Sequence, residues 1–403
     1  NVTISCLILL LFIASFCIIL SNSFSRNQNI TKDEELIGTY IDGEYSENIP
    51  NKDTGYVVEK IVCDNNATGE WDYENWGITL TNLSKKNKCN IHFRKGVKLA
   101  NTINLVDTTG KCPTVNDDGT VNVTSAESEN SLLCMAPDAY GTSYYFRGNV
   151  QNNYVKFANF YWRIIRVNGD GSVRMLYDGT SAHENGEASE DRQIGKSQFN
   201  DEYYDNAYVG YMYGKPGSST YGETHANIND STIKKYVDNW YEKNIENTIS
   251  KQYIADKVFC NDRTISNITL DDYTNLGYQG ENTTYRWYFD PTPANLTCLA
   301  KNDSFSVEDN KNGNSNLKYA IGLLSDDELY LAGGYVKWAV NSKNNFYLYT
   351  GTSYWLMSAA GYGSSSAWET RVDIDGNKNG FDLRVNATYG VKPVINLKCN
   401  SLK

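Results

Sequence analysis

The chain has 403 residues, more than a single hydrophobic core usually organises, so more than one domain is expected. Hydrophobic residues make up 40% of the sequence and charged residues 21%, a composition that excludes wholesale disorder. Tyrosine dominates the aromatic residues, with 31 Tyr beside 13 Phe and 8 Trp. The net charge is −11, which argues against nucleic acid as a partner because an acidic surface repels the phosphate backbone.

The first strong pattern is an uncharged apolar segment that runs from Ile4 to Leu20. It is close to the shortest length that spans the ~30 Å hydrocarbon core of a bilayer, and slightly longer than a signal-peptide core. We therefore expect residues 1–26 to form a transmembrane signal-anchor, with a cleaved signal peptide as the alternative. Either route exports the rest of the chain, so the sequence predicts a protein of the cell membrane that faces outward, or a secreted one.

The cysteines agree with export. Cys6 and Cys17 lie in the apolar segment, and none of the other seven forms a CxxC motif or has a histidine at zinc-site spacing. In an exported chain, such cysteines are expected to form disulfides. Spacing alone does not fix their connectivity. Proximity along the chain favours the pairs Cys63–Cys89, Cys112–Cys134 and Cys260–Cys298, with Cys399 left over.

A small β domain is expected after a linker. Residues 27–54 are polar and acidic, which is typical of a linker. Over 55–96, apolar and polar residues alternate in short runs broken by Asn and Gly, a pattern that predicts β-hairpins. Trp76 lies midway between Cys63 and Cys89, an arrangement similar to the core of an immunoglobulin-like fold. We therefore expect a small β-sandwich over 55–96.

Residues 97–135 are less regular and are interpreted as a connecting segment. The large domain, 136–399, begins with three strands, and the turn at 168–171 has the Asn-Gly-Asp-Gly residues of a tight hairpin. Apolar residues at helical spacing follow Asp230-Ser231, and Ser325-Asp-Asp-Glu328 is a capping box that opens a second helix. The chain then alternates again as strands. Strands, helices and again strands predict an α+β fold.

These segments resemble the C-type-lectin-like fold, in the branch shared by bacterial sulfatase-modifying-factor-like domains and the variable proteins of diversity-generating retroelements. The strings that carry the resemblance are FYWRIIRVNGDGS at 160–172, IGLLSDDELYLAGG at 321–334 and YGVKPVINL at 389–397, with Lys392 where the family usually has Arg. The resemblance covers about two thirds of the chain. It implies a bacterial surface protein that binds an extracellular protein or glycan, for adhesion or ligand capture, through residues between Tyr354 and Asp382.

Two activities of that fold are not supported by the residues present. The E-P-N, Q-P-D and W-N-D motifs of calcium-dependent lectins do not occur, and no Cys lies between Tyr354 and Leu397, where the formylglycine-generating enzymes need one. A calcium loop at Asp373, Asp375 and Asn377 lacks an acidic residue at its twelfth position, so a hairpin turn is the favoured interpretation. We therefore expect no cofactor.

Catalytic motifs are equally sparse. His92, His183 and His225 stand apart, each expected to be a polar surface residue, and the sequence has no nucleophile elbow, phosphate loop or dinucleotide glycine pattern. The favoured interpretation is that the protein is not an enzyme. An extracellular carbohydrate-active enzyme with a carboxylate pair, or a purely structural envelope protein, remain the alternatives.

The best candidate function is therefore binding by aromatic side chains. Rings mixed with Ser, Asn and Asp combine rigid contact area with adaptable hydrogen bonds. Trp355 and Phe381 are expected in the core instead. The four candidates nearest to turns, expected at the surface, are Tyr362, Trp368, Asn377 and Asn379. The full predicted set of ligand-binding residues is Tyr354, Tyr362, Ser364, Trp368, Asn377, Asn379 and Asp382.

Overall fold

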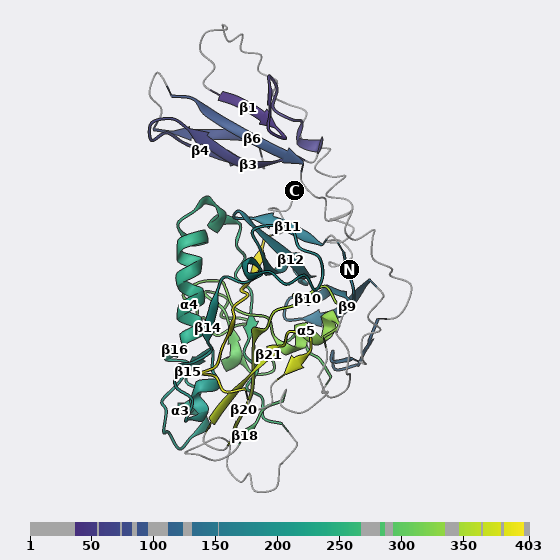
Figure 1. Ribbon diagram of the computed structural model, residues 1–403, viewed down its shortest axis with the longest axis vertical. Coiled ribbons are helices and arrows are strands. Elements are labelled where there is room, and N and C mark those ends of the chain that lie inside the picture. The colour runs from purple at the N-terminus through teal and green to yellow at the C-terminus, as the bar shows by residue number, and fades with distance from the viewer. Residues whose placement is uncertain are drawn as a thin grey trace. The chain divides into compact units, whose positions relative to one another are not determined.

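The structure is a computed structural model that divides into two compact units, one of Asn1–Thr102 with Asn400–Lys403 and one of Ile103–Cys399 (Figure 1). The division lies within the segment 97–135 that was predicted to connect two domains. The residues described are 37–54, 56–72, 75–82, 87–95, 112–123, 131–151, 153–266, 283–286, 293–334, 346–363, 366–379 and 383–398.

The first unit is built on a four-stranded sheet of order β2-β1-β6-β3, in which β1 runs parallel to β6 and the other pairs are antiparallel. A separate hairpin, β4 with β5, completes it. A short 3-10 helix, η1 (Lys52–Thr54), precedes β3. The strands are β1 (Ile37–Ile41), β2 (Glu44–Ser46), β3 (Tyr56–Cys63), β4 (Thr68–Asp72), β5 (Gly77–Thr81) and β6 (Cys89–Lys95).

The prediction that all of 27–54 is a linker is therefore wrong for residues 37–46. The segment IGTYIDGEYS is polar enough to resemble a linker, yet it forms a tight hairpin with Asp42 and Gly43 at positive φ. Its first strand then pairs with β6 over five residues. Partner strands decide the structure of such a short polar segment, because its own alternation is too weak to predict a strand.

The core of this unit lies between the sheet and the hairpin. Trp71 packs edge-on against Phe93, with ring centroids 5.1 Å apart, and both are buried together with Ile91. The predicted disulfide Cys63–Cys89 is present. Its two cysteines are register partners on adjacent strands of one sheet, whereas the disulfide of an immunoglobulin domain bridges two sheets.

The second unit contains a six-stranded sheet of order β24-β13-β12-β10-β9, with β11 paired to β12. The three strands and the turn predicted at its start are present, and Gly171 in that turn has φ 87°. The strands are β9 (Leu132–Asp138), β10 (Gly141–Arg147), β11 (Tyr154–Phe157), β12 (Phe160–Val167), β13 (Val173–Gly179) and β24 (Val394–Leu397). The last strand, from the closing string of the chain, thus pairs with an early one.

A second six-stranded sheet has the order β14-β23-β20-β21-β22, with β18 paired to β20. Its strands are β14 (Lys196–Gln198), β18 (Thr283–Thr284), β20 (Tyr354–Gly363), β21 (Ser366–Val372), β22 (Lys378–Asn379) and β23 (Thr388–Gly390). Three two-stranded ribbons complete the unit. They pair β7 (Thr114–Val115) with β8 (Val121–Asn122), β15 (Met212–Tyr213) with β16 (Asn229–Asp230), and β17 (Phe259–Cys260) with β19 (Ser304–Phe305).

The helices of the described residues are short. The two predicted ones are present: Ser231 caps the first, and Ser325 with Glu328 forms the expected capping box of the second. The α-helices are α3 (Tyr221–Thr224), α4 (Thr232–Tyr241) and α5 (Asp326–Ala332). The single helical turns are η2 (Glu190–Arg192), η3 (Asn206–Val209), η4 (Glu242–Glu246), η5 (Ile249–Tyr253) and η6 (Lys301–Asp303).

The predicted α+β class is therefore wrong, since strands take up 39% of the structure and helices only 15%. Capping signals locate where a helix begins, but the helix α5 ends after seven residues at Gly333, which adopts φ 114°. Within the described part of the chain, no helix is long and apolar enough to cross a membrane. The predicted transmembrane segment, residues 1–26, lies outside the described residues.

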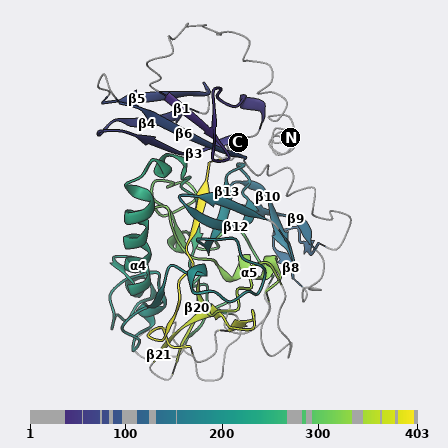
Figure 2. The same cartoon turned by 45° about the horizontal axis from the view of Figure 1, so that its top comes forward.

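Two disulfides and a continuous core hold the second unit together. The predicted pairs Cys112–Cys134 and Cys260–Cys298 are present, while Cys399 lies outside the described residues. All ten residues of β20 are buried, and so are all seven of α5. Figures 1 and 2 both place β12 toward one end of this unit and β20 and β21 toward the other, with α4 along one side.

Candidate ligand-binding surface

The structure places several of the predicted binding residues in the core. Tyr354 is fully buried, and its Oη donates a hydrogen bond to the Leu348 carbonyl, 3.0 Å away. Tyr362 is 2% exposed and Asn377 is also buried, so the expectation that these two lie at the surface is wrong. The reason is that β20 is covered along its whole length, which strand alternation does not reveal.

The other predicted residues are partly exposed or lie outside the described residues. Trp368 and Asn379 are each partly exposed. Ser364, Asp382 and the expected core residue Phe381 lie outside the described residues. Trp355 is buried as predicted, and its Nε1 donates to the Ser197 carbonyl at 2.9 Å.

The segment considered for calcium forms a turn. Oδ1 of Asp373 accepts the backbone N–H groups of Asp375 at 2.9 Å and Asn377 at 3.1 Å. Those hydrogen bonds account for the alternating Asp and Asn residues as turn residues. Among the residues that the structure describes, no group of three His, Cys, Asp or Glu side chains is placed to hold a metal ion.

A row of four tyrosine rings lies beside β20 and β21, and we call it the tyrosine row: Tyr203, Tyr204, Tyr208 and Tyr213. Successive ring centroids are 6.4, 5.5 and 5.3 Å apart, and the rings meet edge-on. Tyr204 is 57% exposed, Tyr203 and Tyr213 are partly exposed, and Tyr208 is buried beneath them. Edge-to-face contacts at these distances stabilise the arrangement of the rings.

Two hydrogen bonds to backbone carbonyls join the row to the segment that was predicted to bind. Tyr362 donates its hydroxyl to the Tyr204 carbonyl at 2.9 Å, and the Ala367 N–H donates to the Tyr203 carbonyl at 2.6 Å. Asp205 caps η3 by accepting from the Ala207 N–H at 2.9 Å. The segment that bears these rings is therefore hydrogen-bonded to the buried strands β20 and β21, and Tyr362 holds the backbone of Tyr204 in place.

Negative charge lies near Tyr213 in the row. Burial raises the pKa of the Tyr213 hydroxyl, and the charges of Asp201, Asp230 and Glu202 raise it further. Burial also raises the pKa of Tyr208, together with its hydrogen bond to Tyr204. These hydroxyls stay protonated at neutral pH and act as hydrogen-bond donors and acceptors. The surface thus combines neutral phenol rings with carboxylates.

The tyrosine row was not predicted from the sequence, because residues 203–213 are far along the chain from the segment between Tyr354 and Asp382 that the resemblance indicated. A signal was present, since five tyrosines occur among the eleven residues 203–213. Binding surfaces draw on aromatic residues from loops that a scaffold holds in place, so such a density of Tyr within a polar segment is a usable indicator.

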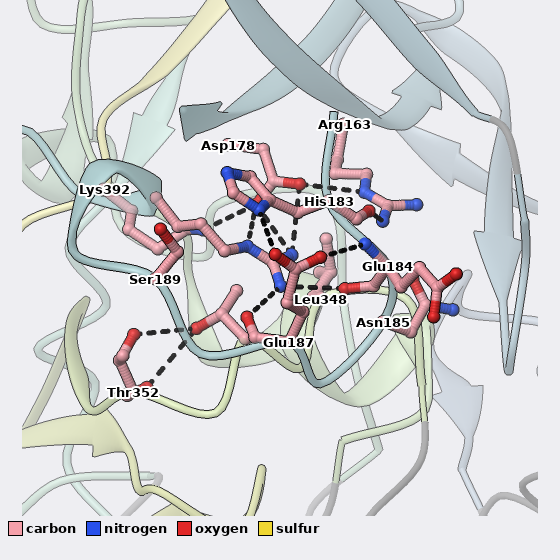
Figure 3. A network of polar contacts seen from close by, with 12 residues as sticks. Arg163, Asp178, His183, Glu184, Asn185, Glu187, Ser189, Leu348, Thr352 and Lys392 are labelled. Carbon is pink, nitrogen blue, oxygen red and sulfur yellow. Dashed lines mark hydrogen bonds and ion pairs between the residues drawn. The ribbon is translucent and has the colours of Figure 1, made fainter. Parts of the chain in front are cut away.

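A second candidate is a polar network around Asp178, on β13. Its carboxylate is buried and meets Arg163 Nε at 3.0 Å, Arg192 Nε at 3.0 Å and Lys392 Nζ at 3.0 Å. Figure 3 shows Arg163 and Lys392 reaching Asp178 from opposite sides. Three cations and one anion leave a net positive charge, but the guanidinium of Arg192 also donates to the carbonyls of Glu184 and Glu187. Those extra hydrogen bonds offset part of the desolvation cost.

The pKa shifts follow from this geometry. Burial acts to raise the pKa of Asp178, but the charges of Lys392, Arg192 and Arg163 hold it below its usual value. Burial lowers the pKa of Lys392 to about 8, with Asp178 opposing that effect. The network is fully enclosed, so its charged groups stabilise the fold and offer no face to a ligand.

His183 lies next to this network, and its loop also contains Glu187 (Figure 3). Its Nδ1 is 3.0 Å from Glu187 Oε1, its Nε2 is 2.8 Å from Asp191 Oδ1, and Ser181 Oγ is 3.2 Å from Nε2. Ser, His and Glu in this order are reminiscent of a catalytic triad, but Asp191 already occupies the nitrogen that would take the serine proton. The imidazole therefore links two carboxylates of one loop. His183 and His225 are buried, so their expected surface position is wrong.

Comparison with known proteins adds no relative. No protein-family model, no curated protein and no solved structure matches the chain. The resemblance to C-type-lectin-like domains therefore remains a prediction from motifs.

Proposed function

We propose that this chain is an exported, extracellular protein that binds a ligand, for adhesion or ligand capture, and that the tyrosine row is its binding surface. The observation that carries the proposal is the exposed ring of Tyr204, which packs between the half-buried ring of Tyr203 and the buried ring of Tyr208. Tyrosine offers large, rigid contact area with a polar end, at a low cost in conformational entropy.

The compartment is supported by the disulfides. Three cysteine pairs are bonded, in both units of the chain. Disulfides persist in oxidising environments and are rare in the cytosol. An extracellular location agrees with the export predicted from residues 4–20, and with a function that depends on meeting a partner outside the cell.

Solvent accessibility favours the tyrosine row over the Asp178 network as the ligand-binding surface. A ligand contacts only groups that reach the surface, and the carboxylate of Asp178 with its three cationic partners is enclosed. The row instead presents ring faces and edges beside the exposed carboxylates Asp201 and Glu202.

The experiment is an array of purified glycans and secreted proteins, screened with the full chain and with Tyr204→Ala. Tyr45→Ala serves as the matched control, since Tyr45 is 53% exposed in the other unit. Truncation of a central aromatic contact costs about 2 kcal/mol, which is roughly a 30-fold loss of affinity. We expect Tyr204→Ala to lower the affinity for at least one array ligand by this factor, and Tyr45→Ala to leave the affinity for that ligand unchanged.

Two results would overturn the proposal. An array without any bound ligand would contradict the binding function. Ligands that bind Tyr204→Ala as tightly as the parent chain would contradict the surface assignment. Circular dichroism of both variants must match the parent chain, which is expected because each replaced ring is more than half exposed.

A further inference from the structure

The tyrosine row has a second property besides exposed rings, namely two neighbouring carboxylates that have no ion-pair partner among the residues that the structure describes. Asp230 is paired with Lys234, whose Nζ is 3.2 Å away. Asp201 and Glu202 are both exposed, and neither has an ion-pair partner among the residues that the structure describes. Asp201 only accepts a hydrogen bond from the Thr232 hydroxyl at 3.0 Å.

The rings themselves attract cations. The face of an aromatic ring is electrostatically negative, so an ammonium or guanidinium group within about 6 Å of its centroid is favoured. One end of the row already shows this contact, because the Arg384 guanidinium lies 5.5 Å from the centroid of Tyr203. Tyr204 and Tyr213 continue the row beyond that arginine, next to the carboxylates.

The spacing of the row matches an extended polypeptide. Side chains on one side of an extended chain are about 6.6 Å apart, since each residue advances the chain by about 3.3 Å. The ring centroids of Tyr203 and Tyr204, two neighbouring rings that both reach the surface, are 6.4 Å apart. Basic residues at alternate positions of a bound segment therefore meet the rings of Tyr203 and Tyr204 in turn.

We propose that the tyrosine row binds an extended basic segment of a partner polypeptide, with lysine or arginine at alternate positions. This inference rests on the proposed function and names its partner class. Ring faces attract the cationic heads, and Asp201 and Glu202 neutralise them. The same carboxylates repel anionic ligands such as sulfated or phosphorylated ones.

The test uses the full chain and a fluorescent peptide of five Lys-Ser repeats, followed by fluorescence anisotropy. Glu-Ser repeats and the same peptide with acetylated lysines are the ligand controls. We expect the lysine peptide to bind and the two control peptides not to bind. Added salt should weaken the binding, because it screens exposed charges. Tyr204→Ala should weaken it about tenfold.

The carboxylates are tested by the pair Asp201→Asn with Glu202→Gln, which keeps the hydrogen-bond acceptor for Thr232. The chain is acidic overall, so the control is Glu70→Gln with Glu308→Gln, two exposed glutamates outside the segment 201–213 that give the same change in net charge. We expect the first pair of substitutions to lower the affinity for the lysine peptide about fivefold. The second pair should lower it only by the smaller amount that the change in net charge produces.

The outcomes separate the two proposals. Equal weakening by both pairs would assign binding to net charge and overturn the inference. An array ligand that depends on Tyr204, together with no binding of the lysine peptide, would leave the proposed function standing and overturn this inference alone. Absence of both kinds of binding would overturn both.

Discussion

The tyrosine row and the Asp178 network belong to the same unit and differ in how their polar groups are satisfied. Around Asp178, every partner is buried and the carboxylate meets three cations. In the row, Tyr204 is 57% exposed and the neighbouring carboxylates Asp201 and Glu202 have no such partner among the described residues. An enclosed network of paired charges stabilises the fold, whereas exposed rings and carboxylates without an ion-pair partner are available to a ligand.

The largest predicted effect is in the Asp178 network. Asp178→Asn removes the only anion of the network and leaves three buried cations without it, so the free energy of unfolding should fall by about 3–5 kcal/mol. The matched variant Lys392→Met removes one excess cation and should cost less than about 1.5 kcal/mol. Urea unfolding of both variants measures this. Equal losses would contradict the view that Asp178 is the centre of the network.

A third set of charges sharpens the comparison, because it is buried without enough partners. Among the described residues, both carboxylate oxygens of Glu369 and of Asp326 are buried without a hydrogen bond, and Lys378 Nζ lies 3.9 Å from Asp326. Burial raises the pKa of Asp326 to about 7, and burial followed by the charge of Asp326 raises that of Glu369 well above its usual value. A carboxyl group whose pKa is higher in the folded than in the unfolded chain contributes to the free energy of unfolding at low pH. That contribution is lost as the pH rises from about 4 through 7.

Glu369→Gln removes one of these ionisable groups. It should stabilise the chain by about 2 kcal/mol at pH 7 and have little effect at pH 4, because only the wild-type unfolded state gains from ionisation of Glu369 at the higher pH. Thermal unfolding from pH 4 to pH 7 tests this. A stability difference that shrinks as the pH rises would show that Glu369 is ionised and paired in the folded chain.

A smaller effect is expected at His183. If the imidazole links Glu187 and Asp191 as the distances indicate, His183→Ala should lower the free energy of unfolding by about 1–2 kcal/mol. Ser181→Ala is the control, and since Ser181 is exposed it should change stability by less than about 0.5 kcal/mol. A hydrolytic activity lost in both variants would instead support a catalytic triad.

The smallest effect on stability is predicted in the row itself. Tyr204→Ala should change the free energy of unfolding by less than about 1 kcal/mol, because more than half of the ring is exposed. The same variant should give the largest loss of binding. A destabilisation comparable to that of Asp178→Asn would show that the row is part of the core. It would contradict the distinction between an exposed tyrosine row and an enclosed Asp178 network.

Features that depend on local residues could be predicted from the sequence. The caps at Ser231 and Ser325, the turn ending in Gly171 and the three disulfide pairs were all found in this way. Each is decided by side chains a few residues apart, or by cysteines that are near one another along the chain. The lengths of the helices were not predictable, so the α+β class was wrong.

Features that depend on distant residues were not predictable. Arg163, Asp178, Arg192 and Lys392 are brought together from four segments, and no spacing along the chain indicates their contact. Tyr362 was expected at the surface, but its strand is covered on both faces by elements far away in the sequence. The position of Tyr204 above it follows from a hydrogen bond between residues 158 positions apart.

The most direct test of the account is the affinity of an array ligand for Tyr204→Ala compared with Tyr45→Ala, two variants that each remove a tyrosine that is more than half exposed. If the tyrosine row is the binding surface, Tyr204→Ala loses roughly 30-fold in affinity while its unfolding curve stays close to that of the parent chain, and Tyr45→Ala binds normally. Equal affinity of the two variants for every array ligand would contradict it.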